Sequence, residues 1–288
     1  MEHIMYHSTN GRSDAVNFEQ ALLRGMGSNY GLYMPVREDI PRLSVEVIEE
    51  MRDMSYSEIA FKVLEPFLGS EIPGNKLKVL LDDAYRGDKI PTDIQTVAGK
   101  THIMWLTQGP TYSFKDYAAR FFARALSYFL GERGLKRIVL DGTSGDTGGA
   151  IADSLYELPD VYNVVFYPKG AISEGQRKQM TTLKENIFAF EVNGPFDVCQ
   201  SLVKYLSGDN EFAEDVFGDP YIFTSANSIN IGRILPQAVY PFFAYSRVAG
   251  DGEQMIASIP SGNFGDMMGT VIAKEMGLPV SKILCGVN

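Results

Sequence analysis

Apolar positions along the chain follow helical spacing up to about residue 100 and a mixed pattern beyond it. Residues 18–24 and 57–68 carry helical patterns, and loops that contain prolines separate them. This pattern predicts a mainly helical N-terminal region over residues 1–100. The prolines that we place in its loops are Pro35, Pro41, Pro66 and Pro73.

Residues 114–129 predict an amphipathic helix. Apolar side chains recur there at i, i+3, i+4 and i+7, which is the spacing of one helical face. Gly131 and Gly134 are suitable residues to end it. The polar residues that we expect to lie off the apolar face are Asp116, Arg120 and Arg124.

After residue 136, short apolar runs alternate with helical patterns. The alternation predicts an α/β fold in which parallel sheets have helices on both faces. The runs that predict strands are 138–140, 164–167, 187–192, 221–224, 255–259 and 283–287. The segments that predict helices between them are 147–158, 176–183, 196–206, 231–247 and 264–276. Because the last run reaches the final residues, we expect a truncated product or a short variant.

The composition argues against several classes of partner. The 288 residues are 45% hydrophobic, and their net charge of −10 argues against nucleic acid or an anionic membrane. No run approaches the roughly 18 apolar residues that span a bilayer. Two cysteines and an N-terminus without signal-peptide features predict a cytoplasmic location. Three scattered histidines and the absence of Cys-x-x-Cys predict that no metal is bound.

A lysine in the first turn of a predicted helix is the most informative residue of the chain. It is Lys115, in the segment Gly109-Pro110-Thr111-Tyr112-Ser113-Phe114-Lys115-Asp116. The helix macrodipole disfavours a cation there, which shifts the lysine toward the neutral amine that attacks aldehydes. With the glycine-rich turns described next, this lysine predicts a pyridoxal phosphate (PLP) enzyme. The alternative is a solvated surface lysine.

Two glycine-rich turns each link a predicted strand to a predicted helix. They are Asp141-Gly142-Thr143-Ser144-Gly145-Asp146-Thr147-Gly148 and Pro260-Ser261-Gly262-Asn263-Phe264-Gly265-Asp266. Such turns lie at the carboxyl ends of parallel strands, where ligands bind. Free N–H groups and hydroxyls at a helix start bind anions, and glycine lets the backbone approach closely. The alternative is that small polar residues serve only as N-caps and turn formers.

A third polar block opens the helix predicted at 231–247. It is Ser225-Ala226-Asn227-Ser228-Ile229-Asn230-Ile231-Gly232-Arg233. An arginine with serine and asparagine at a helix start suits a phosphate or carboxylate. The alternative is an ordinary capped helix with Arg233 in solvent.

Four of these blocks, in this order, resemble threonine synthase. They are Gly-Pro-Thr-x-x-Phe-Lys-Asp from Gly109, Thr-Ser-Gly-Asp-Thr-Gly from Thr143, Asn-Ser-Ile-Asn-x-x-Arg from Asn227 and Pro-Ser-Gly-Asn-Phe-Gly-Asp from Pro260. The likeness covers essentially the whole chain. It implies a fold-type-II PLP enzyme, a lyase of threonine biosynthesis that converts O-phosphohomoserine and water to threonine and phosphate.

The resemblance also implies roles for individual residues. Lys115 is expected to carry the cofactor as a Schiff base and to shuttle protons. The cofactor-binding residues that it implies are Lys115, Asp146, Ser261, Gly262, Asn263, Phe264 and Gly265. The substrate-binding residues are Thr143, Ser144, Gly145, Thr147, Ser228, Asn230 and Arg233, of which the last three are candidates for the substrate phosphate.

We divide the chain into an N-terminal region (1–100), a small domain (136–226) and a PLP-binding large domain (101–135 and 227–288). Threonine synthases continue beyond the strand that ends here at Asn288. No residue of this chain is assigned to the cofactor's pyridine nitrogen, so we hypothesise that the isolated chain holds the cofactor without turnover. A PLP-binding protein without turnover is thus one alternative to threonine synthase activity. The other is a different fold-type-II reaction, such as serine or threonine dehydration.

Overall fold

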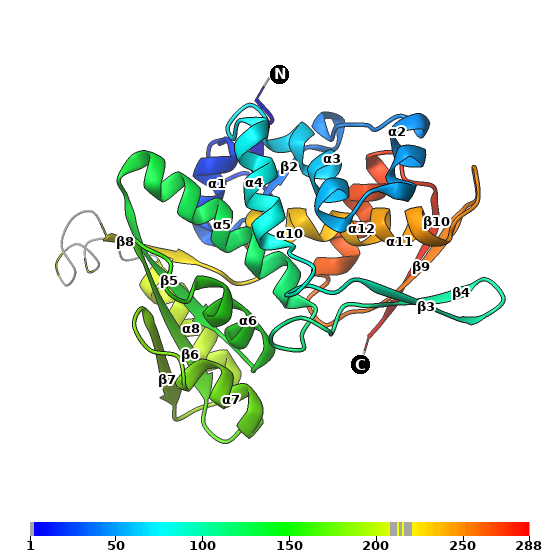
Figure 1. Cartoon of the computed structure of the whole chain (residues 1–288). Helices are drawn as coiled ribbons and strands as arrows, with labels where there is room; N and C mark the ends of the chain where they lie inside the picture. The colour runs from blue at the N-terminus through cyan, green and yellow to red at the C-terminus, as the bar shows by residue number, and fades with distance from the viewer. Residues whose placement is uncertain (1–2, 208–211, 213–214, 216–220, 288) are drawn as a thin grey trace.

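Parallel strands form the larger sheet of the structure, in the order β7–β6–β5–β8. The computed structural model describes residues 3–207, 212, 215 and 221–287. The strands are β5 (Lys136–Gly142), β6 (Val161–Pro168), β7 (Ile187–Val192) and β8 (Tyr221–Ser225), seen at the lower left of Figure 1. From β5 the chain moves outward to β6 and β7, then returns to β8 on the other side of β5. Ligands bind at such a reversal, beyond the carboxyl ends of the strands.

Helices cover both faces of this sheet. They are α6 (Asp146–Leu155), α7 (Glu174–Thr181) and α8 (Phe196–Ser207). Val139 of β5 packs in the main core with Ile151 of α6, whereas Ile138 and Leu140 pack with Val203 of α8. Successive strand side chains point to opposite faces. The predicted α/β fold with two covered faces is therefore confirmed.

A second parallel pair consists of β9 (Met255–Pro260) and β10 (Val280–Gly286), joined through α12 (Gly265–Glu275). Near it lies an antiparallel hairpin, β3 (Asp93–Ala98) and β4 (Thr101–Trp105), which extends to the right in Figure 1. The sequence pattern did not predict this hairpin. Its side chains are exposed or half-buried on both faces, so no apolar alternation marks it.

The helix α5 (Lys115–Arg133) packs against α4 (Gly74–Ala84), α6 and α10 (Ile231–Ile234). Gly134 ends it in the left-handed conformation, with φ 62°, while Gly131 lies inside it. Asp116 and Arg120, expected off the apolar face, are nevertheless buried. The reason is tertiary: the Arg120 Nε atom donates to the Ala84 carbonyl of α4 at 2.7 Å.

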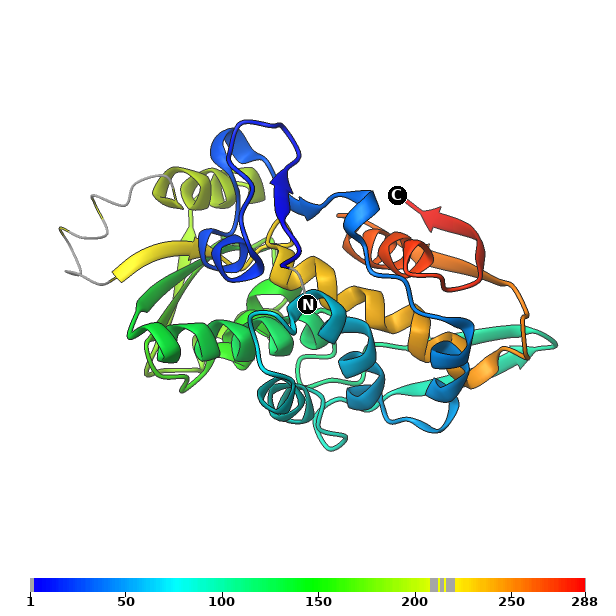
Figure 2. The same cartoon turned by 90° about the horizontal axis from the view of Figure 1, so that it is seen from above.

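The helix predicted at 231–247 is a run of three segments. They are α10 (Ile231–Ile234), a 3₁₀ turn η4 (Leu235–Ala238) and α11 (Val239–Val248). Pro236 lies at the start of the 3₁₀ turn, where it lacks the N–H that a continuous α-helix would use. These segments lie among α3, α5 and α12, at the centre of the molecule in Figure 2.

The N-terminal region is mainly helical, as predicted. Its helices are α1 (Phe18–Arg24), α2 (Val45–Glu50), α3 (Tyr56–Leu68) and α4 (Gly74–Ala84), and its short strands are β1 (Tyr6–Ser8) and β2 (Tyr33–Pro35). Short 3₁₀ turns are η1 (Ser28–Tyr30), η2 (Arg37–Asp39) and η3 (Met51–Asp53). One prediction was wrong: Pro66 lies inside α3, in its last turn. The capping box of Ser55 and Glu58 starts that helix.

Candidate functional site

Lys115 begins α5 with its side chain largely buried. Its Nζ atom lies 3.6 Å from Oδ2 of Asp146 and 4.5 Å from the ring centroid of Phe114. Burial lowers the pKa of Lys115, the positive charge of Arg233 lowers it further, and Asp146 opposes both. Burial thus favours the neutral amine that the sequence pattern predicted. The alternative of a solvated surface lysine is wrong, because the side chain is only 17% exposed.

The turn before Lys115 is held by a buried carboxylate. Asp116 accepts hydrogen bonds from the Thr111 N–H at 2.9 Å and from the Thr111 hydroxyl at 2.5 Å. A Cβ atom on Gly109 would lie 2.4 Å from the same carboxylate. Glycine is therefore required for this turn to close around Asp116, and the turn sets where Lys115 enters the helix.

The turn after β5 is closed by its own hydroxyl. The Thr143 side chain is buried and accepts from the N–H groups of Gly145 at 2.9 Å and Gly148 at 2.8 Å. Ser144 and Asp146 are exposed and Thr147 is half-buried. Thr143 therefore holds the turn from beneath, while its neighbours face outward. The substrate-binding roles of these residues stay predictions.

A glutamine that the sequence analysis missed reaches this turn from α7. Gln176 Nε2 donates to Oδ1 of Asp146 at 2.7 Å, while the other carboxylate oxygen faces Lys115. Gly145 has φ +135°, and a Cβ atom there would lie 2.4 Å from Gln176. No motif marks Gln176, because its role arises only when α7 packs beside the turn.

Arg233 lies at the start of α10, only 3% exposed, so the alternative of a solvent-exposed arginine is wrong. Its Nη1 atom donates to the Ala226 carbonyl at 2.6 Å, and its Nε atom has no partner among the described residues. The nearby carboxyl of Asp141 is fully buried, and burial raises its pKa to about 6 against the opposing charge of Arg233. Both side chains are buried, and the charge of each acts on the pKa of the other.

The other polar residues of this block have mixed surroundings. Asn230 is fully buried: its Oδ1 accepts from the Gly232 N–H, and its Nδ2 donates to the Leu22 and Ser225 carbonyls. This amide joins α1 to the start of α10 and leaves Asn230 in a structural position. Ser228 is half-buried. Asn227, which the sequence analysis did not select, donates to Asp141 Oδ1 at 2.8 Å.

The turn after β9 is open: unlike the turn after β5, which its own Thr143 hydroxyl closes, it has donors without partners among the described residues. The Ser261 Oγ atom is buried and has no hydrogen-bond partner within the described ranges. Gly262, Asn263 and Phe264 are exposed, and no acceptor in the described part of the chain takes their N–H groups. Phe264 has φ 60°, which directs the chain into α12. A free hydroxyl and free N–H groups at a helix start suit an oxyanion.

A cleft of about 950 Å³ connects this turn with the start of α5. Phe114, the neighbour of Lys115, lines it together with Tyr240, Pro260 and Asp266. The Tyr240 hydroxyl donates to the Phe114 carbonyl at 3.3 Å. Asp266 is largely buried, and burial raises its pKa to about 6. The cleft is therefore bordered by Phe114, which precedes Lys115, and by Pro260 and Asp266, which flank the open turn.

The described residues include neither a candidate membrane-spanning helix nor a candidate metal-binding cluster. No helix among them is both long and apolar enough to cross a membrane. No group of three or more histidine, cysteine, aspartate or glutamate side chains in these ranges could hold a metal ion.

Comparisons with known proteins point to one family. Residues 5–85 match the family model described as the threonine synthase N terminus. Threonine synthase from Escherichia coli is 38% identical over 96% of this chain and 62% of its own length, and that of Pseudomonas aeruginosa is 36% identical over 98% and 60%. The PLP-bound threonine synthase structure from Brucella melitensis matches with a TM-score of 0.88 at 33% identity, over 98% of this chain and 60% of that one. The chain thus spans about three fifths of the length of these relatives.

Proposed function

This chain is homologous to threonine synthases over nearly all of its length, and we propose that it is a PLP-dependent lyase acting on O-phosphohomoserine. The substrate reacts with water to give threonine and phosphate. The observation that carries this proposal is the buried Lys115 amine, whose pKa burial lowers, next to a cleft that Phe114 borders together with Pro260 and Asp266, the residues that flank the open turn.

The residues present fit PLP. Lys115 is the amine that would hold the cofactor's aldehyde, because its neutral form is nucleophilic. The Ser261 hydroxyl and the N–H groups at Gly262, Asn263 and Phe264 would hold the cofactor's phosphate, since they have no other acceptor among the described residues. When bound, PLP withdraws electrons from the carbon atoms of an amino-acid substrate.

Two charged residues, Lys115 and Arg233, would then act on the substrate, and an aspartate supports each of them. Lys115 would move protons at its α and β carbons, and Asp146, 3.6 Å away, stabilises the ammonium form between transfers. Arg233 would hold the phosphate that leaves the γ carbon, because a guanidinium binds phosphate through paired hydrogen bonds. Asp141 keeps Arg233 charged in its buried position.

The test is to reduce the PLP-treated chain with borohydride and to map the modified peptide by mass spectrometry. We expect an adduct on Lys115 that is absent in Lys115→Ala and retained in Lys76→Ala, a variant of an exposed lysine on α4. A folded chain without this adduct would overturn the proposal. Phosphate release from O-phosphohomoserine then tests the reaction itself.

A second candidate is PLP binding without turnover. The observation that favours it is that apolar side chains on the β9–β10 pair lie open: Ile256 is 58% exposed and Leu284 is 52% exposed. The outcome that supports this candidate is an adduct on Lys115 without phosphate release.

We also place the protein in the cytoplasm, because Cys199 and Cys285 are free thiols, as a reducing compartment maintains.

A further inference from the structure

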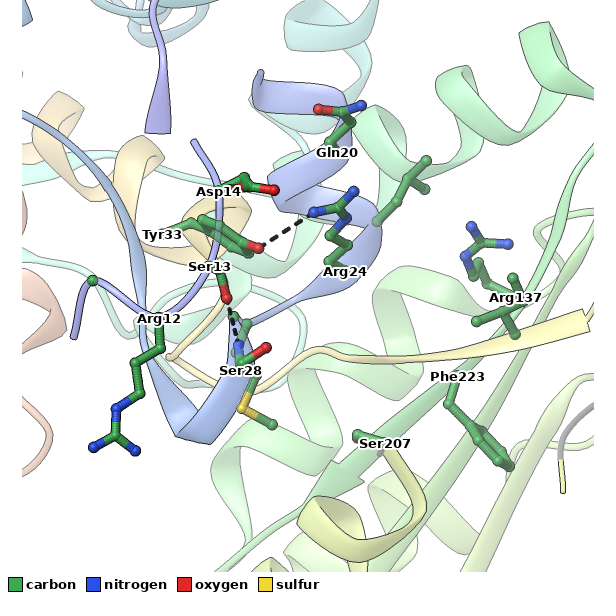
Figure 3. Close-up of a pocket in the computed structure, with 15 residues that line it drawn as sticks. Arg12, Ser13, Asp14, Gln20, Arg24, Ser28, Tyr33, Arg137, Ser207 and Phe223 are labelled. Carbon is green, nitrogen blue, oxygen red and sulfur yellow. Dashed lines mark hydrogen bonds between the residues drawn. The ribbon is translucent and has the colours of Figure 1, made fainter. Parts of the chain in front are cut away.

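A second polar pocket lies at the opposite end of the larger sheet from Lys115. We call it the arginine pocket; it encloses about 840 Å³ and is lined by Arg12, Arg24, Arg137, Ser13, Tyr33 and Ser207, among others. Arg137 is the second residue of β5, whereas Asp141 near the other end of that strand belongs to the site described above. Figure 3 shows that the lining residues come from the N-terminal segment, from β5 and from the end of α8.

Arg137 is the residue that makes this pocket unusual. It is only 6% exposed, its Nη1 atom donates to the Lys136 carbonyl at 2.8 Å, and its buried Nε atom has no partner among the described residues. Burial lowers the pKa of Arg137, and no acidic group among the described residues opposes the shift. A buried guanidinium remains charged, so its burial is costly unless an anion accompanies it.

Each of the other buried arginines of the described chain is under the influence of a carboxylate charge that raises its pKa. Arg120 lies 3.8 Å from Asp153 and also donates to two carbonyls of α4. Arg233 has the charge of Asp141 beside it. Arg137 is the exception in this part of the structure, which indicates that its counter-charge comes from a ligand.

The remaining groups of the pocket are also donors. Arg24 is exposed and forms no ion pair within the described ranges; its Nη1 atom donates to the Tyr33 hydroxyl at 3.5 Å. That leaves the Tyr33 proton free to donate. The Ser13 hydroxyl accepts from the Ser28 N–H at 2.7 Å, so its proton is free as well (Figure 3). The Ser207 hydroxyl is buried and has no partner among the described residues.

One carboxylate, that of Asp14, also lines the pocket. It forms no ion pair with the three arginines among the described residues, and a single negative charge leaves the pocket net positive in a chain whose net charge is −10. Guanidinium groups, together with hydroxyls whose protons are free to donate, form a donor set that suits tetrahedral oxyanions.

We propose that the arginine pocket binds a small phosphate-bearing anion, either inorganic phosphate or a phosphate monoester, between Arg24 and Arg137. The ligand would tie the N-terminal segment, which carries Arg24, to β5 of the larger sheet. Because it would bind the folded chain and not the unfolded one, it would also stabilise the fold. The site is separate from the proposed catalytic one and does not depend on PLP.

The experiment follows the side-chain Nε–Hε signals of the ¹⁵N-arginine-labelled chain by NMR during titration with inorganic phosphate. We expect the Arg24 and Arg137 signals to shift along one common saturation curve. Arg24→Gln should weaken the affinity that Arg137 reports by about tenfold, the effect of one lost charged hydrogen bond. Arg42→Gln, at an exposed arginine outside the pocket, should leave it unchanged.

The readout is specific to the site, so phosphate bound near Arg233 or Ser261 does not disturb it. Unmoved Arg24 and Arg137 signals throughout the titration would overturn the proposal, as would an unchanged affinity in Arg24→Gln. Ser13→Ala is a second variant: it removes a hydroxyl of the pocket and should also weaken the affinity that Arg137 reports. A parallel titration with glycerol phosphate separates the two sources: a tighter curve identifies a monoester as the ligand, and a weaker one identifies free phosphate.

Discussion

The turns after β5 and β9 have similar sequences but differ in whether their hydrogen-bond donors have partners among the described residues. Each has small hydroxyl-bearing and glycine residues, and each ends in Gly-Asp at a helix start. In the first turn, Thr143 takes the N–H groups of Gly145 and Gly148. In the second, the Ser261 hydroxyl and three exposed N–H groups have no partner among the described residues. The donors of the first turn are paired within the chain, whereas those of the second are free for a ligand.

The difference shows what composition cannot decide. Thr143 is buried, so its oxygen reaches the backbone of its own turn, whereas Ser261 follows β9 into an open turn at the cleft. The closed turn therefore acts as a rigid support that presents Asp146 to Lys115. The open turn has donors free for an oxyanion, as its proposed role requires. The following predictions test this division, from the largest effect to the smallest.

Gly145→Ala should destabilise the chain by about 3 kcal/mol, because an alanine is strained at φ +135° and its Cβ atom would displace Gln176. Gly262→Ala is the matched control in the open turn: φ is not positive and nothing lies within 4 Å of the added Cβ atom. We expect its free energy of unfolding to stay within about 0.5 kcal/mol of the parent. Urea unfolding measures both, and equal losses would contradict the division.

If the open turn holds the cofactor's phosphate, a different group must hold the substrate's phosphate. Arg233→Lys keeps the buried charge beside Asp141 but loses the planar fork. We expect kcat/KM for phosphate release from O-phosphohomoserine to fall about 100-fold, equivalent to one lost bidentate contact.

The control for Arg233→Lys is the PLP adduct on Lys115, which should form as in the parent chain. Dehydration of L-serine, a substrate without phosphate, should change little. If both reactions fell equally, Arg233 would not be a phosphate ligand, and a dehydratase would become the better assignment.

Thr143→Val removes the acceptor of two N–H groups and should cost about 2 kcal/mol of stability. Ser261→Ala removes a hydroxyl with no partner among the described residues, so stability without cofactor should stay within about 0.5 kcal/mol. Its affinity for PLP should instead fall about tenfold. Thermal unfolding with and without PLP distinguishes the two variants, and a reversed pattern would exchange the roles of the two turns.

Local pattern predicted the regular elements well. The strand predicted at 187–192 and the helix predicted at 18–24 have the observed bounds, because apolar periodicity and capping residues determine both. The lysine, the two turns and Arg233 were also found from the sequence. What was missed depends on packing between distant segments. Gln176 becomes a partner of Asp146 only across 30 residues, and Asn227 becomes a partner of Asp141 only because β5 and β8 are neighbours.

The burial of Asp116 and Arg120 was missed for the same reason. A single helical face predicts one buried side, but α5 is surrounded by α4, α6 and α10. Its second side is therefore buried as well, and the polar groups there are satisfied by Thr111 and Ala84. No periodicity within residues 114–129 contains that information. The domain boundaries and the roles of the individual site residues stay predictions.

The aspartates that follow the two turns, Asp146 and Asp266, provide the prediction with the smallest expected change in stability. Asp146 is half exposed beside Lys115, whereas Asp266 is largely buried and burial raises its pKa to about 6 from 3.8. Between about pH 4 and 6 the folded chain thus holds a proton at Asp266 that the unfolded chain has lost, and stability contributed by this group falls as the pH rises. Above about pH 6 both states are ionised, and the penalty is constant.

Asp266→Asn removes this titration. Relative to the parent, the variant should gain stability progressively from about pH 4 to pH 6 and then remain about 1 kcal/mol more stable, after allowance for partial exposure. Urea unfolding across this range measures the difference, in which the titration of Asp141 cancels because both chains contain it. Met267→Leu, one residue further along α12, should show no such slope. A flat difference for Asp266→Asn would mean that the open turn leaves its aspartate solvated, like Asp146.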